Sequence, residues 1–343
     1  MRSTLALALT LALGTAIASP VSDGQAAPKV WRLGALWPTT VSSDFDALLQ
    51  GLRDLNYVEG QNLIIEHRSA QSQLERLPEF ASELARLKVD IVFAWATPAA
   101  RAAKDATSTI PIVMVVGEPV GVGLVQSLAR PGGNVTGLSL NNAEVAARRL
   151  QLLKEVAPRI TRIAVITNQG NPGFTAIHLQ AMRPAAETLG LQLREIGVRA
   201  PDQLEDAFRA MLKERVEGVN MLADPMWGGE AARRIATFAR QHRLVSIYDS
   251  SSFTERGGLL AYGPNTHAIM RRAAWYIDRI LKGVSPRNLP VEQPTEFRLV
   301  INLGTAKVLG LTIPQSVLIR ADHVITFDDP DRLKPNTGMQ PPR

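Results

Sequence analysis

The chain has 343 residues with a formal net charge of +6, no cysteine, 45% hydrophobic residues and 20% charged residues. This length suits two globular domains with ordinary hydrophobic cores. The lack of cysteine excludes disulfides, thiolate metal sites and a thiol nucleophile, and the positive charge, interleaved with acidic residues, predicts a solvated surface rather than a nucleic-acid-binding face.

The first 27 residues have the pattern of a secretory signal peptide. Arg2 precedes an apolar stretch over residues 5–17, and small residues follow as far as Ala27. This stretch is shorter than the roughly 20 residues that span a bilayer, so we expect a cleaved signal, cut after Ala18 or Ala27, rather than an uncleaved anchor. Because no cysteine is available to carry a lipid, we expect a free periplasmic protein and not a lipoprotein.

From residue 30 onward, short apolar runs alternate with longer segments of helical period. Several runs are hydrophobic throughout, which is typical of parallel strands covered on both faces. The alternation predicts α/β layers. The predicted strands are residues 32–36, 63–66, 91–94, 112–116, 134–138, 163–166, 193–196, 219–222, 245–248 and 297–302.

The segments between these runs predict helices. Apolar residues recur along one stripe over residues 77–87, and Ser72 with Glu75 has the spacing of a capping box for that helix. Further helices are predicted over residues 144–156, 269–281 and 305–309.

The βα series occurs twice, which predicts two Rossmann-like, doubly wound α/β lobes joined by a hinge, with a crevice between them. The first series ends near residues 139–142 and the second begins at Arg162. Prolines mark a connector over residues 286–294. The tail from Asp328 is rich in proline and poor in apolar residues, so we expect it to be disordered.

Six X-Pro dipeptides stand just after apolar runs. One reading is that Thr97, Asn171 and Asp224 simply cap helices, since these residue types suit that position. The other is that they line a ligand site, because ligands of open α/β sheets bind beyond the carboxyl ends of the strands. The dipeptides are residues 37–38, 97–98, 118–119, 171–172, 224–225 and 263–264.

The two lobes carry matching acidic turns, Glu118-Pro119 and Asp224-Pro225. Two acidic groups facing each other across a cleft suit an amine or hydroxyl groups. Helix N-termini at Thr97 and Asn171 suit a carboxylate. Together these residues favour a zwitterion or a small polar acid as ligand.

Aromatic residues near the strand ends are further candidates for ligand contact, since an aromatic side chain can stack on a ring or an aliphatic chain. Trp37, Tyr248 and Tyr262 are the candidates retained. The alternative for each is burial in the core, which is the favoured interpretation for Trp95.

Catalytic patterns are missing. The five histidines lack metal-binding spacing, no G-x-S-x-G elbow occurs, and the glycines at residues 121–123 lack the third glycine of a dinucleotide fingerprint. We therefore expect no enzyme, no metal and no cofactor. An isomerase that uses Glu118 and Asp224 as acid and base is the least favoured alternative.

Several longer stretches resemble the ABC transporter substrate-binding protein family that includes the tryptophan/tyrosine-type periplasmic binding proteins. The similarity runs from Val30 to Ile325. The stretches that carry it are residues 51–62, 97–100, 127–137, 262–264, 290–295, 300–303, 305–307 and 309–314.

The resemblance implies a type I periplasmic-binding-protein fold with three crossovers between the lobes, which close around the ligand. It implies an N-terminal lobe of residues 28–140 plus 264–290, a C-terminal lobe of residues 141–263 plus 291–326, and a tail of residues 327–343. It also implies a small-molecule solute, with an amino acid or an aromatic or branched carboxylate as the best candidate.

The same resemblance implies an inner-membrane permease with its ATPase as partner, and we expect a monomer. A sensory module that docks a membrane receptor is the alternative within this fold. The chain departs from the family pattern at Trp37, at Glu118, where many members have Asp, and around residues 167–173. These departures touch the expected pocket, so the ligand of a relative is not transferred here.

Overall fold

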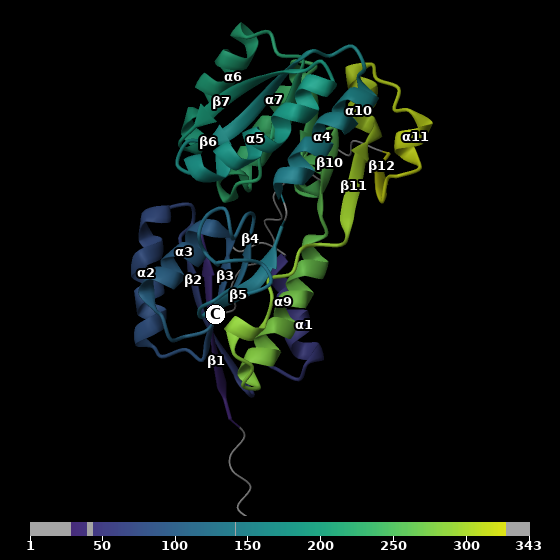
Figure 1. Cartoon of the computed structure of the whole chain (residues 1–343). Coiled ribbons are helices and arrows are strands. Elements are labelled where there is room, and N and C mark those ends of the chain that lie inside the picture. The colour runs from purple at the N-terminus through teal and green to yellow at the C-terminus, as the bar shows by residue number, and fades with distance from the viewer. Residues whose placement is uncertain (1–28, 40–43, 141, 327–343) are drawn as a thin grey trace, which may run out of the picture.

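The computed structural model describes residues 29–39, 44–140 and 142–326, which form two α/β lobes (Figure 1). The predicted signal peptide and C-terminal tail lie outside these residues. All ten predicted strands and the three later predicted helices coincide with observed elements, while the prediction missed β10 and β12. The prediction of two doubly wound lobes is confirmed.

The first lobe is built on a five-stranded parallel sheet of order β2-β1-β3-β4-β5. Helices α1 and α9 pack together on one face, and α2 and α3 cover the other. The strands are β1 (Trp31–Trp37), β2 (Leu63–Ser69), β3 (Ile91–Trp95), β4 (Ile112–Val116) and β5 (Val135–Ser139). The helices are α1 (Asp44–Asp54), α2 (Leu77–Arg86), α3 (Ala96–Ala106) and α9 (Thr266–Leu281).

The second lobe is built on a seven-stranded sheet of order β12-β11-β10-β9-β8-β6-β7, in which only the β10–β11 pair is antiparallel among the described strands. Helices α4 and α5 cover one face, and α6 and α7 cover the other. The strands are β6 (Arg162–Asn168), β7 (Gln192–Val198), β8 (Gly218–Met221), β9 (Val245–Tyr248), β10 (Leu260–Pro264), β11 (Phe297–Asn302) and β12 (His323–Ile325). The helices are α4 (Asn142–Val156), α5 (Pro172–Thr188), α6 (Leu204–Lys213), α7 (Glu230–Gln241), α8 (Ser251–Thr254), α10 (Leu303–Leu309) and α11 (Gln315–Leu318).

The chain passes between the lobes three times: from β5 to α4, from β10 to α9, and from the segment after α9 to β11 (Figure 1). Before the third crossing, Glu292 is held against β5. Its N–H donates to the carbonyl of Gly137 (3.1 Å), and its carbonyl accepts from the N–H of Ser139 (2.7 Å). Glu292, which the predicted boundary assigned to the second lobe, thus hydrogen-bonds to the first.

The predicted capping box at Ser72 and Glu75 is wrong. Helix α2 begins at Leu77 after a 3-10 turn over Leu74–Arg76, and no side-chain cap is present at either start. The reason is a longer-range bond: the N–H of Ser72 donates to the carbonyl of Pro38 (2.8 Å), and Ser72 has a φ of 71°. This tie to the end of β1 outweighs the local capping preference.

Gly137 on β5 is expected to tolerate no side chain. Its φ is 137°, and a Cβ there would overlap the backbone of Met114 on β4. Gly137→Ala should therefore lower the free energy of unfolding by about 3 kcal/mol or more, measured by urea unfolding. The control is Gly133→Ala, where nothing lies within 4 Å of the added atom. Equal unfolding midpoints for the two variants would contradict this account.

Candidate ligand-binding cleft

Two cavities lie where the carboxyl ends of both sheets meet. The smaller has a volume of about 140 Å³ and the larger about 1100 Å³. Both are lined by Pro225 and Asp249, so they adjoin at these residues. The smaller cavity has a mostly apolar wall with a few convergent polar groups, which is the usual character of a small-molecule site. We therefore treat it as the candidate binding site and the larger cavity as its open, polar approach.

Residues of both lobes line the smaller cavity. The first lobe contributes the turn after β3, the end of β4 and the start of the first crossing. The second lobe contributes the turns after β6, β8 and β9. The lining residues are Trp95, Ala96, Thr97, Pro98, Val115, Gly117, Leu140, Asn171, Phe174, Ala223, Asp224, Pro225 and Asp249.

Thr97 lies in the first turn of α3, not at its cap. The N-cap position is Trp95, and no side chain caps this helix among the described residues. The N–H groups of the first turn have no partner within the helix, and the helix dipole favours an anion there. Ala96 has a φ of 64°, a conformation that residues with a side chain rarely adopt. Such strain is often found where a ligand is bound.

Asp224 is held by the protein itself. It caps the short turn Pro225–Trp227 by accepting from the N–H of Met226 (3.0 Å), and it accepts from Asn168 Nδ2 (3.0 Å). The Asn171 side chain also donates to it, although Asn171 stands at the N-cap of α5 without capping that helix. Burial raises the pKa of Asp224, while these donors lower it. The capping interpretation thus describes Asp224 but not Thr97 or Asn171.

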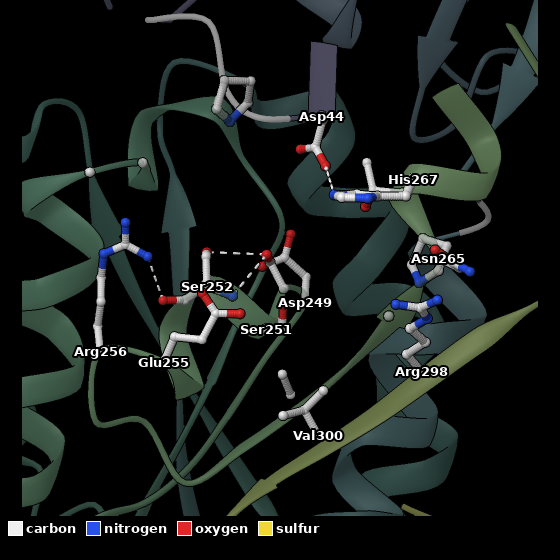
Figure 2. Close-up of a pocket in the computed structure, with 18 of the residues that line it drawn as sticks. Asp44, Asp249, Ser251, Ser252, Glu255, Arg256, Asn265, His267, Arg298 and Val300 are labelled. Carbon is white, nitrogen blue, oxygen red and sulfur yellow. Dashed lines mark hydrogen bonds and ion pairs between the residues drawn. The ribbon is translucent and has the colours of Figure 1, made fainter. Parts of the chain in front are cut away.

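Asp249 is a carboxylate of the smaller cavity that the sequence patterns did not indicate, and the aromatic lining residues Trp95 and Phe174 were likewise not among the predicted contacts. Asp249 directly follows β9 and lines both cavities. Figure 2 shows its carboxylate directed into the larger cavity, between Ser251 and the Asp44–His267 pair. Burial raises the pKa of Asp249, and the positive charge of Arg149 acts in the opposite direction. The signal that could have identified it is its position, one residue beyond the predicted strand.

Glu118 joins the lobes rather than lining either cavity. Its Oε1 accepts from the N–H of Ala143 in the first turn of α4 (3.0 Å). Its backbone neighbour Gly117 does line the smaller cavity and accepts from Ser139 Oγ (3.0 Å). Burial raises the pKa of Glu118, and the charge of Glu144 adds to this effect.

The three predicted aromatic contacts lie behind the cavity walls. Trp37 is fully buried and stacks on Trp95 (centroids 5.4 Å apart), so it supports the tryptophan that does line the cavity. Tyr248 is also fully buried and stacks on Phe253 (4.5 Å). Tyr262 packs against the core of the second lobe, and its carbonyl accepts from Arg149 Nε (2.7 Å). None of the three lines either cavity.

The larger cavity has charged walls of both signs (Figure 2). His267 Nε2 lies 3.6 Å from Asp44 Oδ1, and Arg256 Nη1 donates to the carbonyl of Ser252 (2.6 Å). No cluster of acidic, histidine or cysteine side chains in the described parts of the chain could hold a metal ion. Over the same residues, no helix has the length and apolar character needed to cross a membrane.

The profile of the ABC transporter substrate binding protein family matches residues 40–325. A tyrosine-binding protein of Clostridioides difficile is 27% identical over 77% of this chain and 75% of its own length. A conserved domain protein of Vibrio cholerae is 30% identical, with a TM-score of 0.80 over 86% of this chain and all of that one. An ABC domain from Streptococcus pneumoniae in complex with L-Trp has a TM-score of 0.79 at 24% identity, over 87% of this chain and all of that one.

Two replacements of Asp224 distinguish the contribution of its capping hydrogen bond to stability from the contribution of its charge. Asp224→Ala removes the acceptor for the N–H of Met226 and should lower the free energy of unfolding by about 1–2 kcal/mol. Asp224→Asn keeps an acceptor oxygen, so its loss should be smaller. Chemical denaturation at pH 7 measures both; equal losses would show that the cap contributes nothing.

Glu118→Gln should be more stable than the parent chain at pH 7. Because burial raises the folded-state pKa of Glu118, its ionised form destabilises the folded state. This penalty is present above the folded-state pKa and is lost as the pH falls below the unfolded value. The glutamine keeps an acceptor for the N–H of Ala143. The stability difference should therefore vanish near pH 4, as measured by denaturation across pH; a constant difference would contradict the assignment.

Proposed function

Because this chain belongs to the ABC transporter substrate-binding protein family, we propose that it binds an amino acid with an aromatic or branched apolar side chain in the smaller cavity. The family is one of substrate-binding proteins, which confirms the prediction that the chain is not an enzyme. The observation that carries the proposal is the carboxylate of Asp249, which no other residue occupies with a hydrogen bond in the described contacts, beside an apolar cavity that both lobes line.

The size and lining of the cavity favour an apolar side chain of this kind. Cavities of roughly 150 Å³ with apolar walls bind one benzene ring, and the cavity here is about 140 Å³. Trp95 and Phe174 form aromatic walls from opposite lobes. Aromatic walls favour stacking with a ring or an aliphatic chain.

The charges of the cavity favour a zwitterion. Asp249 in the second lobe suits the ammonium group, since a nearby cation stabilises the ionised form of a buried carboxyl group. The uncapped start of α3 in the first lobe, with the Thr97 hydroxyl, suits the carboxylate. A ligand held in this way contacts both lobes at once, so it stabilises the closed arrangement more than the open one.

The names of two relatives support the ligand class. The relative from Clostridioides difficile is named for tyrosine, and the Streptococcus structure holds L-Trp. We extend the proposal to delivery of the amino acid to an inner-membrane permease and its ATPase, as a monomer. Residues 1–27 would direct the chain to the periplasm, and the lack of cysteine favours a free protein over a lipoprotein.

A thermal-shift screen of the mature protein, freed of co-purified solute by unfolding and refolding, tests this function. L-Tyr, L-Trp, L-Phe and L-Leu are compared with tyramine, which lacks the carboxylate, and with the deaminated acid of tyrosine. At 100 times Kd a ligand adds about 2.7 kcal/mol to stability, which corresponds to a rise in Tm of roughly 4 °C for a chain of this length. At least one amino acid should give this shift and both analogues should lose most of it.

Asp249→Asn should abolish most of the shift, whereas Glu255→Gln, at a carboxylate that lines only the larger cavity, should retain it. A shift produced by none of the amino acids would contradict the proposed function. A full shift with the deaminated acid would contradict the role of Asp249.

A further inference from the structure

Arg149 is a buried charged residue that lines neither cavity. It lies on α4, the helix that follows the first crossing, and its side chain is 0% exposed. Its Nε donates to the carbonyl of Tyr262 on β10, the strand that leads into the second crossing (2.7 Å). Both Nη atoms are buried and have no hydrogen-bond partner among the described residues.

An uncompensated guanidinium in this position is costly, because burial removes its hydration. Burial lowers the pKa of Arg149 to about 10, and Asp249 is the charge that most favours its protonated form. In turn, the charge of Arg149 is the largest of the effects that lower the pKa of Asp249, against the effect of burial, which raises it. No direct ion pair joins the two side chains in the described contacts. The parallel register of β9 and β10 pairs Tyr248 with Ala261, so Asp249 follows β9 beside Tyr262, whose carbonyl holds the Arg149 guanidinium.

We propose that Arg149 is a positioning residue for ligand binding: fixed by the Tyr262 carbonyl, its guanidinium is the buried counter-charge that keeps Asp249 anionic and ready for a ligand ammonium group. This inference rests on the proposed function, since it assigns Asp249 to the ammonium. Arg149 itself lines neither cavity, so it acts through Asp249 rather than by touching the solute.

Other titratable groups lie near Asp249, but none of them is a buried positive charge that could replace Arg149 as its counter-charge. Asp224 repels it and is itself occupied by three donors. His178 lies on α5; burial, with a smaller effect from the charge of Arg149, lowers its pKa to about 4, so it is neutral at pH 7 and adds no charge there. The remaining groups lie around the larger, open cavity, where water screens them. They are Asp44 of α1, Glu230 of α7, Glu255 and Arg256 after α8, His267 of α9, Arg298 of β11, and Asp322 and His323 near β12.

The first experiment needs no ligand. The carboxyl carbons of aspartate are labelled with ¹³C, and Asp249, assigned by comparison with Asp249→Asn, is titrated by NMR in the parent chain, Arg149→Met and Arg148→Met. Arg148 is the neighbouring residue on the same helix, but it is exposed and donates to Gln151. The titration midpoint of the Asp249 carboxyl group should move to higher pH in Arg149→Met and stay unchanged in Arg148→Met. An unchanged midpoint in Arg149→Met would overturn the inference, even if no amino acid proved to bind.

The second experiment measures affinity for the amino acid that the thermal screen identifies. At pH 7, Arg149→Met should bind it about 10- to 100-fold more weakly, and the deficit should shrink as the pH rises and Asp249 ionises. Arg149→Lys should restore much of the affinity. In Asp249→Asn the further change Arg149→Met should have little effect. Arg149 would be only a structural residue if its loss of affinity did not change with pH and if the losses of Arg149→Met and Asp249→Asn were additive in the double variant.

If Arg149→Met does not fold, Arg149→Gln gives the same comparison, because its amide is neutral yet still able to donate to the Tyr262 carbonyl. Failure of every amino acid in the thermal screen would refute the proposed ligand. The ligand-free titration would still decide whether Arg149 sets the charge of Asp249.

Discussion

Three carboxylates, those of Glu118, Asp224 and Asp249, are buried near the junction of the two lobes, and the arrangement of the cleft follows from how each is compensated. The carboxyl ends of both parallel sheets face this junction, and the three crossings keep them opposed. The turns after the strands bring acidic residues into buried positions, where an ionised carboxyl group is costly. Glu118, Asp224 and Asp249 all have raised pKa values for this reason.

Each of the three carboxylates is compensated in a different way. The compensation distinguishes the two carboxylates with a structural role from the one that is available to a ligand. Asp224 receives three hydrogen bonds from its own lobe, so its oxygens are occupied. Glu118 accepts from the start of α4 and thereby joins the two lobes. Asp249 has a counter-charge, Arg149, and among the described contacts it accepts only from its own backbone N–H, so its carboxylate remains available to a solute.

The apolar part of the cleft is arranged in layers. Trp95 lines the smaller cavity, and the fully buried Trp37 stacks behind it. In the second lobe, Phe174 forms the opposing wall, and its ring packs on His178 (centroids 3.8 Å apart). Side chains supported from behind lose little further freedom when a ligand binds, which favours affinity.

The sequence encodes ten of the twelve described strands, the two βα series and the strand-end turns in recognisable patterns, because periodicity and proline geometry are local properties. It thereby identified Thr97, Asn171 and Asp224, which the structure brings to one cavity. Which side chains face that cavity depends on tertiary packing. Tyr248 and Asp249 are adjacent, and successive residues at a strand end point to opposite sides, so a one-residue difference separates core from cleft. The contact of Arg149 with Tyr262 joins residues 113 positions apart, and no local pattern encodes a contact of that kind.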